Sequence, residues 1–258
     1  MWRITVSSLI LLCLTGCQRA DMTKVIAYTK SDNAPGVKSE LAKGFDPGIL
    51  NSKDGAEAIT PVHIAAEHGN VEILKLFLDS GVNVNLREPD GSTALLLATL
   101  KGKTPAAELL LERRADPNLA TNSGYPPLVA AVAQQNRTLV RDLVGHGANV
   151  NTASGPLTPL SAAASNGDLD TTLFLLSHGA DINQSPKDGM RPVDAAVASG
   201  DTKMLLNLLA RGGEPTSWAG DTQFALQKRD LMTASMLRAA FRNHAAASKK
   251  AATSPQPK

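Results

Sequence analysis

The feature that most constrains the fold of this chain is a repeat with a period of about 33 residues. Residues suited to ending a helix recur at spacings of 33, 33, 32 and 33, and so do residues suited to starting one. The ending positions are Gly81, Arg114, Gly147, Gly179 and Gly212, and the starting positions are Thr60, Thr93, Pro126, Thr158 and Arg191. A fixed period of this length indicates a stack of supersecondary units, not one globular core. Such stacks build long binding surfaces and seldom carry catalytic groups.

The first clear unit shows which elements to expect. Thr60 suits a helix N-cap, and Pro61 fits the first helical position, where no N–H is needed. From Pro61 to Gly69 the apolar residues form one stripe at helical spacing, and Gly69 can end the helix in a left-handed conformation. A second, nearly buried helix is predicted over residues 71–79. The turn residues Glu88-Pro89-Asp90-Gly91 then lead to the next unit.

The unit resembles the ankyrin repeat, whose signature is Thr-Pro-Leu-His-x-Ala. Five copies cover residues 59–213, and the resemblance implies an all-α ankyrin-repeat solenoid of helix-turn-helix units with β-turn fingers. In the family the signature His joins adjacent repeats by hydrogen bonds. Only His63 keeps it, so we expect looser contacts at the replaced positions, which are Leu96, Val129, Ser161 and Asp194. Arg114 takes a left-handed cap position that suits Gly better, at a cost of about 1 kcal/mol.

Both ends of the stack are expected to carry capping elements, because a solenoid exposes an apolar face at each end. Residues 35–58 are predicted to form an N-terminal capping half-repeat. Residues 214–244 are predicted to form a degenerate C-terminal repeat, sealed by Trp218, with helices over 222–228 and 230–244. The final stretch, 245–258, is rich in Ala, Ser, Lys and Pro, and we expect it to be disordered.

Residues 1–16 have the pattern of a lipoprotein signal peptide. Arg3 gives a positive start, and residues 4–14 form an apolar segment too short to span a bilayer. The segment ends Leu14-Thr15-Gly16-Cys17, which resembles the lipobox of bacterial lipoproteins. This resemblance implies that Cys17 becomes the mature N-terminus and carries fatty acyl chains such as palmitate. An ordinary secretory signal with an incidental cysteine is the alternative. Residues 17–34 are polar, and we expect them to form a flexible tether.

The residue after the lipobox bears on location. In lipoproteins an Asp at this position favours retention in the inner membrane, and here it is Gln18. The expected location is therefore the bacterial outer membrane, lipid-anchored and facing the periplasm. Cys13 lies in the removed segment, so the mature chain has no disulfide. Removing Arg3 from the 26 basic residues leaves 25 against 24 acidic ones, and this balance gives no indication of nucleic-acid binding.

The sequence predicts no catalytic group, no metal site and no cofactor. His146 and His178 hold equivalent positions, but no third ligand recurs beside them, and a helix C-terminus explains them. Local hydrogen bonds to the backbone explain the oxygen-bearing side chains of the loops, which are Asp116, Asn118, Asn149, Asn151, Asp181 and Asn183. The chain has no phosphate loop, nucleophile elbow or zinc-protease motif, so we do not expect an enzyme.

Partner-binding residues are expected in two columns along a concave groove. The residues just before the helix starts lie at the finger bases, and they are Ile59, Ser92, Tyr125, Leu157 and Met190. Beside them runs a polar column that includes Glu67, His68, Lys101, Gln134 and Asn166. All of these except Ser92 are our candidate contact residues, since an apolar line beside a polar strip resembles an interface with a wet rim. The alternative is that the apolar residues pack finger against finger.

These features predict a monomeric protein-binding module. One hypothesis is that it binds and neutralises a toxic effector or a lytic enzyme in the periplasm, as an immunity protein does. The alternative is a periplasmic scaffold that supports an envelope or oxidative-stress enzyme. The sequence does not separate these two hypotheses.

Overall fold

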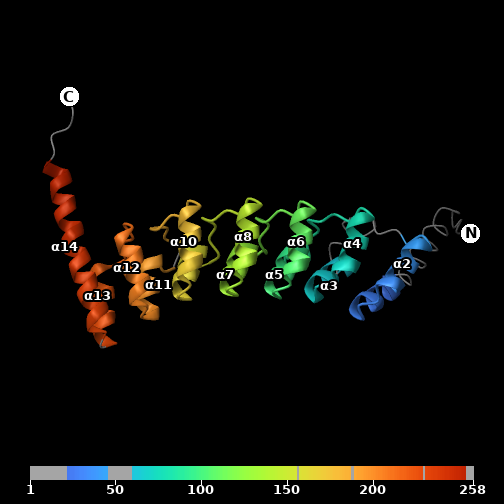
Figure 1. Cartoon of the computed structure of the whole chain (residues 1–258), viewed down its shortest axis with the longest axis horizontal. Helices are drawn as coiled ribbons and strands as arrows, with labels where there is room; N and C mark the ends of the chain where they lie inside the picture. Colours follow the sequence, from blue (N-terminus) through green and yellow to red (C-terminus); the bar gives the residue numbers. More distant parts are fainter. Residues whose placement is uncertain (1–21, 46–59, 156, 187–188, 229, 254–258) are drawn as a thin grey trace, which may run out of the picture. The chain divides into compact units, whose positions relative to one another are not determined.

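The computed structural model describes residues 22–45, 60–155, 157–186, 189–228 and 230–253. Within this part of the chain the regular structure is helical, apart from isolated β-bridges that join Arg87 to Thr93 and Ser154 to Leu157. Pairs of helices follow one another along the chain, and a loop joins each pair to the next (Figure 1). The predicted all-α repeat fold is confirmed. Among the described residues, none of the helices combines the length and apolar character needed to cross a bilayer.

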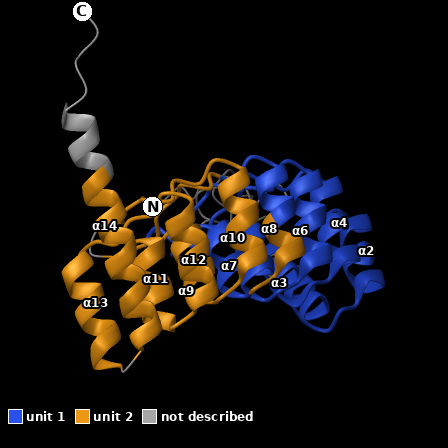
Figure 2. Ribbon diagram, turned by 60° about the vertical axis from the view of Figure 1, so that its left-hand side comes forward, with its two compact units in different colours: residues 1–134, 141–148 blue, residues 135–140, 149–258 orange. Residues whose placement is uncertain are grey.

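The chain divides into two compact units, coloured separately in Figure 2. Unit 1 comprises residues 1–134 and 141–148, and unit 2 comprises residues 135–140 and 149–258. The division falls within one helix, α8 (Arg137–Gly145), which contributes residues to both units.

Unit 1 is a row of helix pairs. It begins with a helix over residues 22–30, followed by α2 (Ala34–Ala42), α3 (Pro61–His68), α4 (Val71–Asp79), α5 (Ala94–Leu100), α6 (Thr104–Glu112) and α7 (Pro127–Ala133). The first helices of successive pairs, α3, α5 and α7, pack side by side, and so do the second helices α2, α4 and α6. The side chains between the layers are small or aliphatic, as with the fully buried Ala65, Ala98 and Leu110. Small residues let neighbouring helices approach closely, so each pair buries the apolar face of the pair before it.

Unit 2 continues the same design with α9 (Pro159–Ser165), α10 (Leu169–Ser177), α11 (Pro192–Ser199), α12 (Thr202–Ala210), α13 (Trp218–Gln227) and α14 (Leu231–Thr253). Helices α9, α11 and α13 form one row, and α14 packs on both α12 and α13. Leu237 of α14 joins a buried cluster with Val193, Met204 and Leu208. Burying a leucine side chain contributes about 1.5–3 kcal/mol, so α14 is held by the core of the unit.

The predicted helix signals are found in varied forms. Thr158 forms a reciprocal capping box with Ser161. Thr158 Oγ1 accepts from the N–H of Ser161 at 3.0 Å, and Ser161 Oγ accepts from the N–H of Thr158 at 2.9 Å. Thr60 holds the N-cap position, but its hydroxyl bonds the His63 ring at 2.8 Å and no backbone amide. Arg114 has the expected left-handed conformation, with a φ of 65°.

The N-terminal end differs from the prediction. Residues 22–30 form a helix in which Val25 and Thr29 are buried, so the expected tether is wrong for these residues. Positive φ angles at Asp32 and Gly44 match the turn and the helix end of the later repeats. This end is therefore a helix pair and not a half-repeat, because its apolar positions pack against the next pair. Residues 1–21 and 46–59, which include the predicted signal peptide and part of the predicted cap, lie outside the described residues.

The C-terminal end also differs. Helix α13 begins at Trp218, four residues before the predicted start, because Ser217 Oγ accepts from the N–H of Gly220 at 3.0 Å and caps the helix there. Helix α14 continues to Thr253, into the stretch expected to be disordered. The physical reason is composition, since this stretch is rich in Ala, the best helix former. Trp218 is half-buried and stacks 5.9 Å from both Phe241 and His244, measured between ring centroids.

The loop asparagines connect one repeat to the next. In each loop the first Asx side chain bonds the backbone locally, as predicted; the Asp181 carboxyl, for example, accepts from the N–H of Asn183 at 2.9 Å. The second Asx reaches further. Asn183 Nδ2 donates to the carbonyl of Gly212 at 3.0 Å, and its Oδ1 accepts from the N–H of Glu214 at 2.7 Å. The sequence analysis missed this second role.

Replacing Asn183 by Ala removes both of these hydrogen bonds between repeats. We expect the free energy of unfolding to fall by about 1–3 kcal/mol, since each bond contributes about 0.5–1.5 kcal/mol. Asn207→Ala is the control, because the Asn207 amide bonds within its own repeat, to Lys203 of α12 and to Arg211 at the C-cap of that helix. Urea unfolding followed by circular dichroism measures both variants. An equal loss in the two would contradict the role assigned to Asn183.

Candidate protein-binding site

The predicted finger-base column is unevenly exposed. In unit 1, Ser92 is buried and bonds Asp90 through both its N–H at 2.8 Å and its hydroxyl at 2.9 Å. Tyr125 is half-buried, and burial raises the pKa of its phenol. In unit 2, Leu157 is half-buried, whereas 43% of Met190 is exposed. Ile59 lies outside the described residues. Among the described members of this column, Met190 is thus the most available to a partner.

The polar column contains one pair that the fold brings together. Lys101 Nζ lies 2.9 Å from Glu67 Oε1, which joins the ends of α5 and α3 in unit 1. Both side chains are well exposed, and such surface pairs contribute only about 0–1 kcal/mol. His68 Nδ1 faces the carbonyl of Ile64 at 2.9 Å, and Gln134 Nε2 donates to the carbonyl of Leu100. These groups can exchange their present contacts for a partner's at little cost.

Asn166 is the polar candidate of unit 2. It is exposed at the C-terminal cap of α9, where its N–H donates to the carbonyl of Ala162 at 3.0 Å. Helix α9 belongs to the row of first helices, and Asn166 lies exposed at its end. This position suits a contact residue. The structure gives it no distinctive chemistry.

A buried histidine lies behind the polar column of unit 1. His63 Nε2 is 3.0 Å from the carbonyl of Leu86, which can only accept, so Nε2 carries the proton. Nδ1 then accepts from the hydroxyl of Thr60. Burial lowers the pKa of His63 and keeps the ring neutral. The 3.7 Å approach of Glu88 Oε1 to Nδ1 is therefore not an ion pair near neutral pH.

Glu88, which lies beside His63 in unit 1, has a strongly shifted pKa. Burial, and then the negative charges of Asp90 and Glu67, raise its pKa to about 7. Between pH 4.5 and pH 7 the folded chain thus holds a proton that the unfolded chain has lost. Its contribution to stability falls as the pH rises through that window. His63 acts in the opposite direction, since its lowered pKa reduces stability as the pH falls below its ordinary value of 6.5.

Glu88→Gln separates the effect of Glu88 on the pH dependence of stability from that of His63. Because Gln mimics the protonated carboxyl, the variant's Tm relative to wild type should rise between pH 5 and pH 8. A rise of a few degrees is expected, since 1 kcal/mol shifts Tm by about 2–4 °C at this chain length. Glu72→Gln, which removes a charge from the exposed side of α4, is the control. Parallel pH profiles for Glu88→Gln and wild type would show that Glu88 is not protonated in the folded state.

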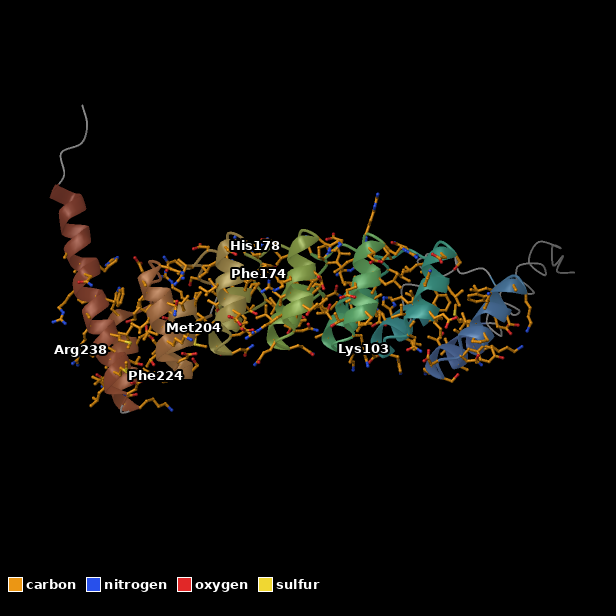
Figure 3. The ribbon with its side chains drawn as sticks, in the orientation of Figure 1. Lys103, Phe174, His178, Met204, Phe224 and Arg238 are labelled. Carbon is orange, nitrogen blue, oxygen red and sulfur yellow. The ribbon has the colours of Figure 1, made fainter. Side chains whose placement is uncertain are left out.

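Met190 stands at the edge of a pocket that the sequence analysis did not find. The pocket has a volume of about 320 Å³ and lies in unit 2, between α11 and α13 and the residues that precede each of them. Its lining includes Met190, Asp194, Val197, Thr216, Asp221 and Phe224. Phe224 is 36% exposed and projects from α13, as labelled in Figure 3. The repeat pattern marks Met190 and Asp194 but not Thr216, Asp221 or Phe224, because these lie in the degenerate last repeat and meet the others only through packing.

Two carboxyl groups from different helices meet in this pocket. Asp194 is fixed by three donors: the N–H of Thr216 at 2.8 Å, the Thr216 hydroxyl, and the N–H of Arg191 at 3.0 Å. Asp221 is half-buried, and its Oδ2 has no hydrogen-bond partner among the described residues. Burial, and then the charge and hydrogen bonding of Asp194, raise the pKa of Asp221 to about 6.

The remaining histidines have structural contacts. His146 Nδ1 faces the carbonyl of Asp142, and His178 Nδ1 faces that of Phe174, both at 2.8 Å and at helix ends. The Phe174 and His178 rings also stack on α10, with centroids 4.1 Å apart (Figure 3). Among the described residues, no group of three His, Cys, Asp or Glu side chains could hold a metal ion. Cys17 lies outside them.

Comparison with known proteins agrees with this repeat geometry. A family profile described as "Ankyrin repeats (3 copies)" matches residues 25–121 and 128–217, which is more than half of the chain. The chain belongs to the ankyrin-repeat family. The first match begins within the helix over residues 22–30, in agreement with a helix pair at the N-terminal end. Ankyrin repeats are protein–protein interaction modules, so the coarse function, protein binding, follows from the family.

Individual relatives match about half of this chain and a smaller share of their own length. The chain is 38% identical over 129 residues to the mouse B-cell lymphoma 3 protein homolog, covering 47% of this chain and 29% of the relative. It is 28% identical over 161 residues to human transient receptor potential cation channel subfamily A member 1, covering 58% and 14%. It is 33% identical over 126 residues to an L-asparaginase of Dirofilaria immitis, covering 48% and 21%. The chain thus spans less than a third of the length of these relatives.

Proposed function

We propose that this ankyrin-repeat protein is a lipid-anchored, non-enzymatic binding module of the bacterial outer membrane. In this proposal it faces the periplasm, where it binds and neutralises a toxic effector or a lytic enzyme. The observation that carries the proposal is the sequence Leu14-Thr15-Gly16-Cys17 at the end of an apolar segment. It lies upstream of a domain whose family binds proteins. A binding surface tethered at the envelope is positioned to intercept proteins that attack the envelope.

The chemistry of the surface supports binding without catalysis. The polar groups of unit 1 are surface contacts that a partner can replace. The described histidines contact backbone carbonyls or hydroxyls, and His244 contacts the Glu214 carboxylate at 2.9 Å. Inhibition of an enzyme needs only a complementary surface that covers its active site. The alternative role, a scaffold that supports an envelope enzyme, uses the same surface and differs in its effect on the partner.

Cys17→Ala tests the anchor. If Cys17 carries the acyl chains, the variant should leave the membrane fraction and should not incorporate labelled palmitate, because each buried CH₂ group contributes about 0.8 kcal/mol to membrane binding. Cys13→Ala is the matched control and should still be acylated. Fractionation and palmitate labelling measure both variants. A wild-type chain that stays unlabelled would rule out the lipid anchor.

Capture of the partner tests the function. A C-terminally tagged chain is used to pull down proteins from crosslinked envelope extracts, and the captured protein's activity is then assayed with and without the chain. We expect a lytic or otherwise toxic activity that the chain suppresses. A captured envelope enzyme whose activity is unchanged or raised would support the scaffold role and contradict neutralisation.

The same partner tests the contact residues. Met190→Ala and Tyr125→Ala should each weaken binding by about 2 kcal/mol or more if these side chains are anchors. Met190 is exposed, so its substitution should leave Tm nearly unchanged. Leu206→Ala is the control, since Leu206 is 48% exposed on a second helix of unit 2. Wild-type affinity in both Met190→Ala and Tyr125→Ala would refute the assignment of the finger-base column.

A further inference from the structure

We propose that the unit 2 pocket between α11 and α13 receives a lysine or arginine side chain from the protein partner. The inference rests on the proposed function only in assuming a protein ligand, and it specifies that ligand's chemistry. The pocket contains two acidic groups at its wall and apolar side chains at its rim. A basic side chain has the matching pattern, with an apolar stem and a charged end.

The two acidic groups that line the pocket are Asp194 and Asp221. Asp221 Oδ2 is buried without a hydrogen-bond partner, and the neighbouring Asp194 already receives three donors. Two carboxyl groups that approach each other in a buried site disfavour each other's charge. The pKa of Asp221 is raised, by burial first and then by Asp194. A positive group placed beside Asp221 would offset the repulsion between the two carboxyl groups and would supply the missing donor.

Arg191 is the cationic residue nearest to this pair in the sequence, but it does not fill the role. Its backbone N–H donates to Asp194, while its side chain is not part of the pocket lining. Its Nε atom is buried and has no hydrogen-bond partner among the described residues. Asp221 Oδ2 therefore has no donor within the described part of unit 2, whereas Asp194 has three.

The apolar rim of the pocket includes Met190 and Phe224. Met190 and Phe224 are 43% and 36% exposed, and both line this pocket. The thioether of a methionine adapts to varied apolar surfaces. The Phe224 ring already has Lys228 Nζ 5.8 Å from its centroid, so it adds apolar surface to the rim. A volume of about 320 Å³ lies at the lower end of the range for ligand pockets. It suits one extended side chain and not a large cofactor.

The test uses small probes, so it does not depend on knowing the partner. N-acetyl-lysine methylamide, N-acetyl-arginine methylamide and the uncharged N-acetyl-norleucine methylamide are titrated into the purified chain. The Met190 methyl resonance reports binding. We expect at least one basic probe to bind about tenfold or more tightly than the norleucine probe, because a hydrogen bond to a charged group is stronger than a neutral one.

Asp221→Asn then identifies the acceptor. This variant keeps the shape of the side chain and removes its charge, and it should abolish the preference for the basic probe. Asp170→Asn, which removes an exposed charge from the first turn of α10, is the control and should keep the preference. Circular dichroism checks that both variants fold. Equal affinity for basic and uncharged probes, or an undiminished preference in a folded Asp221→Asn variant, would overturn the proposal.

The probe result and the function result remain distinguishable. If the basic probe binds but no toxic or lytic partner is captured, the pocket assignment stands and the neutralising role fails. If a toxic partner is neutralised but the probes show no preference for a basic group, the role stands and the pocket assignment fails.

Discussion

The structure depends on each repeat completing the hydrogen bonds of its neighbour. The last carbonyls of a helix have no partner within that helix. Here the residue that follows the helix has a left-handed conformation. Its carbonyl accepts from an asparagine about 30 residues earlier. Asn118 donates in this way to Gly147 in unit 1, and Asn151 to Gly179 in unit 2. The same asparagines accept amide protons, as Asn151 does from Asp181. Because no disulfide is predicted in the mature chain, these hydrogen bonds and the packed alanines stabilise the stacking of the repeats.

The family's signature histidine position shows how one structural role can be filled by different chemistry. In the first full signature, His63 bonds the carbonyl of Leu86 in the following loop. Ser161 instead completes a capping box within its own repeat. Asp194 bonds both the N–H and the hydroxyl of Thr216, so it still reaches the next repeat, and the expectation of a looser contact fails there. This substitution also puts a carboxyl group beside Asp221, which is how a structural position contributes to the proposed pocket.

The sequence predicted what local signals determine. The helix over residues 71–79 was placed with its observed bounds, because its apolar spacing and following glycine lie within one repeat. The ends were predicted less well. The segment 22–30 contains the apolar Val25 and Ile26, which the tether prediction did not take into account, and Val25 and Thr29 form its buried face. Asp221 was missed for a different reason. Its relation to Asp194 depends on where α13 starts and how it packs, and neither follows the repeat pattern.

The two kinds of surface group suit different parts of an interface. Glu67 and Lys101 form an exposed pair worth about 0–1 kcal/mol, so a partner can break it and replace it at almost no net cost. Groups of this kind set orientation and discourage wrong partners more than they add affinity. Asp221 is different, because its oxygen is already desolvated and unpaired before any partner arrives. The carboxylate's share of the desolvation cost of a buried charge pair has there been met during folding, and only the cation's share remains. A cation that reaches Asp221 thus gains more than one that reaches Glu67, which makes the unit 2 pocket the better candidate for the centre of an interface.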